Sequence, residues 1–479
     1  PRMHALRPPA NRPGTQGARR APARRCSRGC AMGCGWSSCC SGCARRAAGA
    51  AGLPCRCLRC LIRCGCPCRH PLADGPSWNT LHDSPRHCWR KPVVCIAGLA
   101  SGALEKNEGA PSVWDFICRP RFEVSYCSVR ALALRPRGTL ASLRLRLTEG
   151  RLRSGEAVPC TASAEGVRVR PVRGTAGIRN LNPGEPVPIA VWQRSIGSLD
   201  QHVNFHAFNY DWRRWGDLVY AEQLVADFQR LVQTDARGRG KVAIVAHSMG
   251  ASVALYCLSV LGRTWAARYV DQLILVGPAH MGSPSMLPSW AHGPVSATKS
   301  LIPAPAFLEH AVGDITATWA CMIAEMPTVV GAVEPWPPDF AFAETPTRRY
   351  TLANMGDFVR DVAACVHGRD TGPALWPSVQ RMARAVRPPA VPTTIVYSDG
   401  HDTPAQLCYD TEDLGAAPRV ARSLPGDGTV LASSVEAVAR AWQADGAEVR
   451  LCKADQAVAH KELIACDFTI AVMRQHWVA

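Results

Sequence analysis

The clearest pattern along the chain is an alternation of short apolar runs with longer segments of helical period. Seven runs read as strands, at 92–97, 187–193, 203–208, 242–246, 272–276, 393–397 and 449–452. The run at 242–246, VAIVA, is apolar throughout, which is typical of a strand buried on both faces. After residue 217, apolar residues recur at intervals of three and four, which predicts a helix. This alternation favours an α/β fold with a mostly parallel sheet.

Further helices are expected at 249–261 and 461–475, and between a capping box of Ser433 with Glu436 and a terminating glycine, Gly446. Two stretches, 110–180 and 283–390, show neither a strand nor a helix period. The second holds Trp290, Trp319, Trp336 and Trp376 among many prolines. Long irregular segments within a compact enzyme are usually lids or caps over a site, although surface decoration is the alternative.

The N-terminal part has a different composition from the rest. Residues 1–88 are rich in Arg, Ala, Pro, Gly and Cys, have no apolar period, and are predicted to form a disordered, low-complexity tail. The cysteine tract at 55–70 suggests soft-metal binding or acylation, but it lacks two ligand pairs a dozen residues apart, so a compositional origin is favoured. We therefore expect a tail at 1–88 and a catalytic domain at 90–478.

The positive charge is concentrated in the same tail. The formal net charge is +17, but residues 1–70 contain 14 Arg and no Lys, Asp or Glu, leaving 41 basic against 38 acidic residues elsewhere. A nearly neutral body gives no electrostatic reason to bind nucleic acid. No uninterrupted run of 18 apolar residues indicates a membrane span. No sequence feature calls for a cofactor or a catalytic metal.

The strongest chemical signal is the segment AHSMG at 246–250, between a predicted strand and a predicted helix. A sharp turn in this context raises a serine hydroxyl above the sheet, and small flanking residues let the backbone make that turn. Ala246 replaces the more usual glycine. We therefore predict that Ser248 is a nucleophile.

A serine nucleophile needs a base and a group that orients the base. In this arrangement the partners follow in the order serine, acid, histidine. Asp427, in the glycine-flanked segment GDGTV, is the candidate acid, with Asp399 and Asp402 as alternatives. His460, after the last predicted strand, is the candidate base. Two other histidines fit less well: His247 adjoins the serine and is expected to point away from it, and His280 precedes Asp427.

Acyl transfer also needs donors for a developing oxyanion. One is expected to be the backbone N–H of Met249, directly after the nucleophile. The other is expected from the turn GLASG at 98–102, from Leu99 or Ala100. No P-loop Lys-Ser/Thr pair follows this glycine-rich turn, so nucleotide binding is not predicted.

Several segments together resemble the lecithin:cholesterol acyltransferase family, which includes phospholipid:diacylglycerol acyltransferases and lysosomal-type phospholipases. They are PVVCIAGLASGALE at 92–105, FNYDWRRW at 208–215, VAIVAHSMGASVALYCL at 242–258, LILVGPAHMGSP at 273–284, GDGTV at 426–430 and HKEL at 460–463. Their order agrees with the family over residues 91–475. The departures are Ala97 in place of proline, Ala246 in place of glycine, and Gly-Pro-Ala at 277–279 in place of Gly-Ala-Pro.

The resemblance implies an α/β-hydrolase fold with a lid near 110–127 and a cap near 283–390. It implies the triad Ser248, Asp427 and His460, and it places Asp211 and Arg213 in the wall of the site. A lid disulfide between Cys118 and Cys127 is also implied. The substrate would be a phospholipid or neutral lipid at a membrane or lipid-particle surface, within the secretory or endomembrane system.

These observations favour a lipid O-acyltransferase or phospholipase that acts through an acyl-serine. A soluble esterase for smaller esters and a non-catalytic binding protein on the same fold are the alternatives. The tryptophan-rich insertion argues against the first alternative, and the complete set of serine, aspartate and histidine argues against the second.

Overall fold

The computed structural model describes residues 90–108, 123–124, 138, 141–182, 188–236, 240–293 and 309–477. The chain divides into two compact units, 1–80 and 81–479, and every described residue belongs to the second. The expected tail, most of the expected lid, and Cys118 and Cys127 lie outside the described residues.

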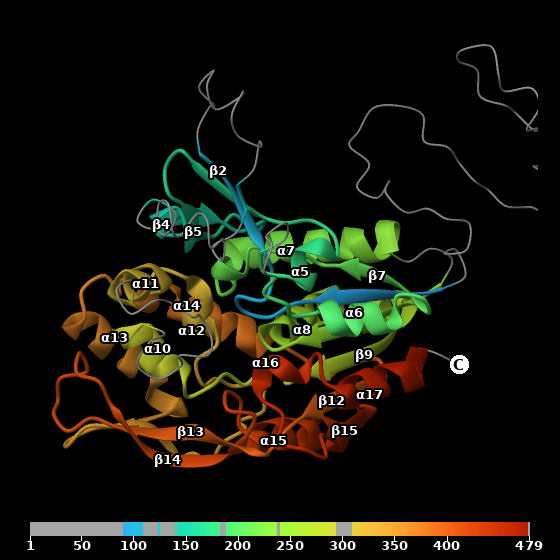
Figure 1. Ribbon diagram of the computed structural model, residues 1–479. Helices are drawn as coiled ribbons and strands as arrows, with labels where there is room; N and C mark the ends of the chain where they lie inside the picture. Colours follow the sequence, from blue (N-terminus) through green and yellow to red (C-terminus); the bar gives the residue numbers. More distant parts are fainter. Residues whose placement is uncertain are drawn as a thin grey trace, which may run out of the picture. The chain divides into compact units, whose positions relative to one another are not determined.

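A six-stranded sheet, parallel throughout, forms the centre of this unit (Figure 1). Its order is β15 (Val449–Lys453), β12 (Thr393–Tyr397), β9 (Val270–Val276), β8 (Val242–His247), β1 (Lys91–Ile96) and β7 (Val203–Ala207). Six of the seven expected runs thus form this sheet. With helices on both faces and a serine turn after β8, it is the predicted α/β-hydrolase fold.

Two apolar layers cover the sheet, one on each face. Successive side chains along β1 and β8 lie on opposite faces of the sheet. Ile96 and Ile244 belong to one apolar layer, and Cys95 and Val245 belong to the other. The first layer includes residues of α7 (Leu218–Arg230), α8 (Met249–Leu261) and α15 (Ala432–Ala444). The second includes residues of α6 (Gln193–Leu199), α16 (His460–Leu463) and α17 (Asp467–Trp477). Burial on both faces explains why β8 has no polar position before His247.

The described part of the stretch 283–390, which was expected to be irregular, contains helices and strands, and we call this segment the cap (Figure 1). Its elements are α10 (Met286–His292), α11 (Glu309–Thr316), α12 (Ala320–Ala324), β10 (Ala341–Glu344), β11 (Arg349–Thr351), α13 (Met355–Cys365) and α14 (Thr371–Ala385). β10 and β11 join β13 (His401–Cys408) and β14 (Arg419–Gly426) in a second sheet of order β11-β10-β13-β14. The expectation of irregular structure was therefore wrong here. Most of α10 is buried, so it has no amphipathic period.

The stretch expected to be irregular near the N-terminus also contains strands. β2 (Leu104–Glu108), β3 (Glu123–Val124) and β6 (Val167–Pro171) form a three-stranded sheet, and β4 (Leu145–Arg151) pairs with β5 (Ala157–Ser163). The remaining segments are α5 (Ala176–Arg179), α9 (Arg263–Tyr269), the 3₁₀ turns η2 (Trp212–Arg214) and η5 (Leu352–Asn354), and the π-helical turn η3 (Leu231–Ala236).

Three local predictions were also wrong. Within the run at 187–193, the described residues 188–192 form no strand: Ala190 makes one isolated bridge, and α6 starts at Gln193. The capping box does not form because α15 begins one residue before Ser433, and the Glu436 carboxylate accepts a hydrogen bond from the Tyr397 hydroxyl instead. The last helix is divided into α16 and α17.

Candidate active site

Ser248 occupies the sharp turn between β8 and α8. Its backbone has φ 56° and ψ −130°, a positive φ that non-glycine residues seldom adopt. The backbone N–H of Ser248 donates to the carbonyl of Val276 (3.0 Å), and its own carbonyl accepts from Ala251 (2.9 Å). Such strain persists only where surrounding contacts hold it, and it is common at reactive residues. The segment AHSMG therefore forms the expected sharp turn between a strand and a helix.

Two glycines let the chain pass close to this turn. A Cβ atom on Gly250 would lie 2.4 Å from the carbonyl oxygen of Ile96, and one on Gly98 would lie 2.6 Å from the Cβ atom of Ser248. Neither position has room for a side chain. Ala246 is fully buried in the sheet, opposite Ile96, so alanine is accepted where glycine is more usual.

His460 lies between Ser248 and Asp427. Its Nε2 atom is 2.8 Å from the Ser248 hydroxyl, and its Nδ1 atom is 2.7 Å from Oδ2 of Asp427. Because a carboxylate only accepts hydrogen bonds, Nδ1 must carry a proton, which leaves Nε2 free to accept the serine proton. His460 and Asp427 are both buried, whereas Ser248 is partly exposed. The structure thus brings together three residues that are 33 to 212 positions apart.

The Asp427 carboxylate is held on both oxygens. Oδ1 accepts the backbone N–H groups of Thr429 (3.0 Å) and Val430 (2.7 Å), which leaves Oδ2 directed at His460. The backbone N–H of His460 donates to the Asp427 carbonyl (2.8 Å). The two alternative acids lie elsewhere: Asp399 forms an exposed ion pair with Lys453 (3.0 Å), and Asp402 is exposed.

The expected oxyanion residues lie at the start of α8 and in the turn that follows β1. Met249 is the first residue of α8, so its N–H has no acceptor within the helix. Leu99 and Ala100 are buried in the turn after β1, in which Ala100 has φ 54°. Gly98 places this turn against Ser248. These positions are suitable for donating to an oxygen bound near the serine, and their assignment as oxyanion donors remains a proposal.

The chain matches the family model "Lecithin:cholesterol acyltransferase" over residues 159–371. The canine protein "Lysosomal phospholipase A and acyltransferase" (Canis lupus familiaris) is 24% identical over 399 residues, which cover 81% of this chain and 91% of that protein. The chicken "Phosphatidylcholine-sterol acyltransferase" (Gallus gallus) is 26% identical over 215 residues, covering 44% and 47%. This chain is similar to the lecithin:cholesterol acyltransferase family. The resemblance inferred from sequence motifs is thereby confirmed.

Comparison with solved structures adds a more distant similarity. A chain in "The crystal structure of Tle4-Tli4 complex" aligns with a TM-score of 0.43 and 14% identity, covering 79% of this chain and 96% of that one.

The segment at 208–215, FNYDWRRW, contains a buried ion pair. The Arg213 guanidinium donates through Nε and Nη2 to both oxygens of Asp211 (2.8 and 2.7 Å), and through Nη1 to the carbonyl of Leu143 (2.9 Å). Both side chains are buried. A carboxylate engaged on both oxygens by one guanidinium is poorly suited to proton transfer, so these contacts favour a structural role for the pair.

His247 has a supporting contact that the sequence did not predict. Its Nε2–H donates to the backbone carbonyl of His460 (3.0 Å), so the strand that precedes the nucleophile holds the backbone of the candidate base. Burial, together with the nearby His460, lowers the pKa of His247 to about 3, so the ring is neutral at neutral pH. The expectation that His247 points away from the serine chemistry left this contact unseen, because it depends on where α16 packs.

Glu325 is a second buried titratable group that the sequence did not indicate. The carboxyl group of Glu325 accepts a hydrogen bond from the hydroxyl of Ser252 (3.3 Å), which lies one turn along α8 from the candidate nucleophile. The backbone carbonyl of Glu325 accepts from the N–H of Ser283 (2.8 Å). Burial raises the pKa of Glu325 to about 8. The protein therefore keeps a neutral carboxylic acid next to the helix that carries Ser248.

This carboxyl group makes a testable contribution to stability. Because its folded-state pKa is raised, its contribution is complete below pH 4.5, the ordinary value, and is lost as the pH rises through about 8. The free energy of unfolding should fall by up to about 1.4 kcal/mol per pH unit from this group alone. Glu325→Gln should remove that slope, as measured by urea unfolding between pH 5 and 8.5.

The matched control for this experiment is Glu149→Gln, because Glu149 is exposed. His247 and His280 act in the opposite direction: burial lowers both pKa values to about 3, so their contribution is lost as the pH falls below 6.5. The measurement on the alkaline side therefore isolates Glu325. An unchanged slope in Glu325→Gln would show that the carboxyl group is already ionised in the folded protein.

Proposed function

We propose that this protein is a serine-dependent enzyme that transfers acyl groups from glycerophospholipid esters, as a lipid O-acyltransferase or phospholipase. The observation that carries the proposal is the placement of His460 at 2.8 Å from Ser248 and 2.7 Å from Asp427. The names of the relatives support the substrate class: they include lysosomal phospholipases A and a phosphatidylcholine-sterol acyltransferase.

In this proposal the reaction has two halves. Nε2 of His460 accepts the Ser248 proton while the hydroxyl oxygen attacks the ester carbonyl, and Asp427 stabilises the imidazolium that forms. Met249 with Leu99 or Ala100 would donate backbone N–H groups to the oxyanion. The lyso-lipid leaves with the proton, and the acyl-serine remains. His460 then deprotonates an acceptor hydroxyl, from water, a sterol or diacylglycerol, and the acceptor oxygen bonds to the acyl carbon. The bond from that carbon to the Ser248 oxygen breaks, and His460 returns the proton to the serine.

The place where the protein meets its lipid substrate is part of the same proposal. None of the described helices is long and apolar enough to cross a membrane. We propose that the protein works at the surface of a membrane or lipid particle and does not bind nucleic acid, because its charge outside the tail is nearly balanced.

The experiment that tests the proposal has two steps. A fluorophosphonate probe should label the folded protein at Ser248, and absence of labelling would favour a non-catalytic binding protein. Products are then analysed with phospholipid vesicles, alone and with sterol or diacylglycerol, and with short-chain soluble esters. We expect release of lyso-lipid from the vesicles. Turnover of the short-chain esters alone would instead favour a soluble esterase.

The domain boundary is tested by truncation. We propose that residues 90–478 are the catalytic domain, with the lid at 110–127 and the cap at 283–390. Deletion of residues 1–88 should leave both the melting temperature and the labelling by fluorophosphonate unchanged. Deletion of residues 1–96 is the matched control. It removes β1, which pairs with both β7 and β8, and should prevent folding.

A further inference from the structure

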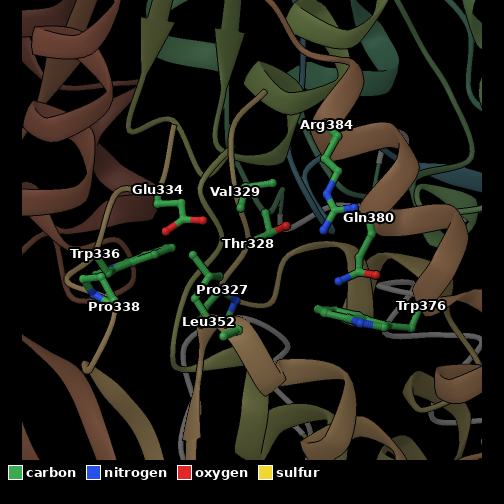
Figure 2. A pocket seen from close by; sticks show the side chains of 11 residues that line it. Pro327, Thr328, Val329, Glu334, Trp336, Pro338, Leu352, Trp376, Gln380 and Arg384 are labelled. Carbon is green, nitrogen blue, oxygen red and sulfur yellow. The ribbon is translucent and has the colours of Figure 1, made fainter. Parts of the chain in front are cut away.

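The cap contains a cavity of about 130 Å³ that includes none of the candidate catalytic residues (Figure 2). It lies between α14 and the segment that connects α12 with β10. Trp336 and Trp376, which contribute to opposite walls, are 5% and 7% exposed, so the aromatic walls belong to the packed interior of the cap. A concave site with aromatic walls and a few polar groups is the usual form of a small-molecule site.

The two walls of this cavity carry opposite charges. Figure 2 shows Glu334 beside Trp336 on one wall, and Arg384 beside Gln380 on the other. Among the described residues, neither Glu334 nor Arg384 forms an ion pair, with each other or with a third group; the hydrogen bond recorded for Arg384 uses its backbone carbonyl. The walls therefore hold the carboxylate and the guanidinium apart. Both side chains are exposed, and neither charge has an ionic partner within the part of the chain that the structure describes.

Each wall is suited to one half of a zwitterion. A carboxylate next to an indole ring favours an alkylammonium group, through charge attraction and cation–π contact. A guanidinium next to a side-chain amide offers several N–H donors to a phosphate or carboxylate oxygen. We propose that this cavity binds a small zwitterion with an alkylammonium group against Glu334 and Trp336 and an oxyanion against Arg384 and Gln380. This proposal rests on the cavity alone and not on the reaction at Ser248.

Such a zwitterion has two sources, a water-soluble phosphodiester and the head group of a lipid in a membrane. Both present the same ammonium and phosphate groups. The probes are glycerophosphocholine for the soluble source and phosphatidylcholine vesicles for the membrane source, with phosphatidylglycerol vesicles as the comparison that lacks the cation. Ser248→Ala serves as the host protein, so that binding is measured without turnover.

Tryptophan fluorescence gives a direct readout because two tryptophans lie in the walls. Glycerophosphocholine should cause a saturable change, and choline or glycerol 3-phosphate alone should bind more weakly than the zwitterion. Glu334→Gln and Arg384→Gln should each weaken binding by about tenfold, the equivalent of about 1.4 kcal/mol. Arg381→Gln is the matched control: it lies one turn away on α14, is exposed, and pairs with Glu156 (2.8 Å).

The possible outcomes distinguish a soluble ligand from a lipid head group, and both of these from failure of the proposal. If glycerophosphocholine binds and the vesicles do not, the ligand is a free zwitterion. If phosphatidylcholine vesicles bind more tightly than phosphatidylglycerol vesicles, and the two cavity variants abolish this preference, the ligand is a head group. The proposal is overturned if neither probe binds saturably, or if Glu334→Gln and Arg384→Gln bind as well as Arg381→Gln does. Loss of Ser248 chemistry affects none of these readouts.

Discussion

Replacement of Ser248 by alanine should abolish turnover without unfolding the protein. The hydroxyl is 2.8 Å from Nε2 of His460, and its removal leaves no nucleophile in the site. Removal of a triad member typically lowers the rate by several orders of magnitude while substrate binding persists. The measurement is lyso-lipid release from vesicles by purified protein with an unchanged melting temperature.

Ser259→Ala is the matched control for this variant. Ser259 is on the same helix, and its hydroxyl donates to the backbone carbonyl of Leu255 (2.6 Å). Loss of that hydroxyl should leave turnover close to that of the unmodified protein. If folded Ser248→Ala retained substantial activity, the assignment of the nucleophile would be wrong, and with it the proposed reaction.

Asp427→Asn should lower turnover by about ten-thousand-fold, the loss seen for the same change in a serine-protease triad. An amide keeps the shape of the side chain but removes the charge that stabilises the imidazolium of His460. The amide also presents an N–H group that favours the wrong tautomer of the ring. Because Oδ1 accepts two backbone N–H groups, the variant must first be shown to melt at the normal temperature.

Asp399→Asn is the control that distinguishes the two acids. Asp399 pairs with Lys453 in an exposed position, and surface pairs of this kind contribute about 0–1 kcal/mol. Its replacement should change turnover little. A dead Asp399→Asn enzyme with a mildly affected Asp427→Asn enzyme would reverse the assignment of the acid.

The central sheet was predictable because strands that are buried on both faces consist mostly of apolar residues, and such runs are visible in the sequence. The run at 242–246 is apolar at every position, and its neighbours in the sheet have the same character. Ser248 was predictable because the nucleophile turn is local: a strand, small residues and a helix lie within a short segment. These features need no knowledge of distant contacts.

The cap was less predictable, although one of its helices had a clear signal. Met355, Phe358, Val359 and Val362 are buried and recur at helical spacing, so α13 was detectable from the sequence. α14 was obscured by Pro377 within it. β10 is short and almost wholly buried, and only its pairing with β11 and β13 defines it as a strand.

The contacts around the site depend on tertiary structure and have no sequence signature. His247 contacts His460 only because α16 returns to the end of β8, and Glu325 is neutral only because the packing of the cap against α8 buries it beside Ser252. The pairing of an exposed Asp399 with Lys453 is similarly invisible along the chain. Sequence order favoured Asp427 over this alternative, and the packing shows which carboxylate faces His460.

The position of Asp427 has a consequence for how the protein can diversify. Asp427 directly follows β14, a strand of the second sheet, to which the cap contributes β10 and β11. The hydroxyl of Ser283, at the start of the cap, donates to the carbonyl of Thr429 in the same loop. The acid is thus held by the second sheet, and the nucleophile by the central sheet. An engineered exchange of the cap would therefore have to keep β14 and its loop, because the cap shares a sheet with the strand that carries the acid.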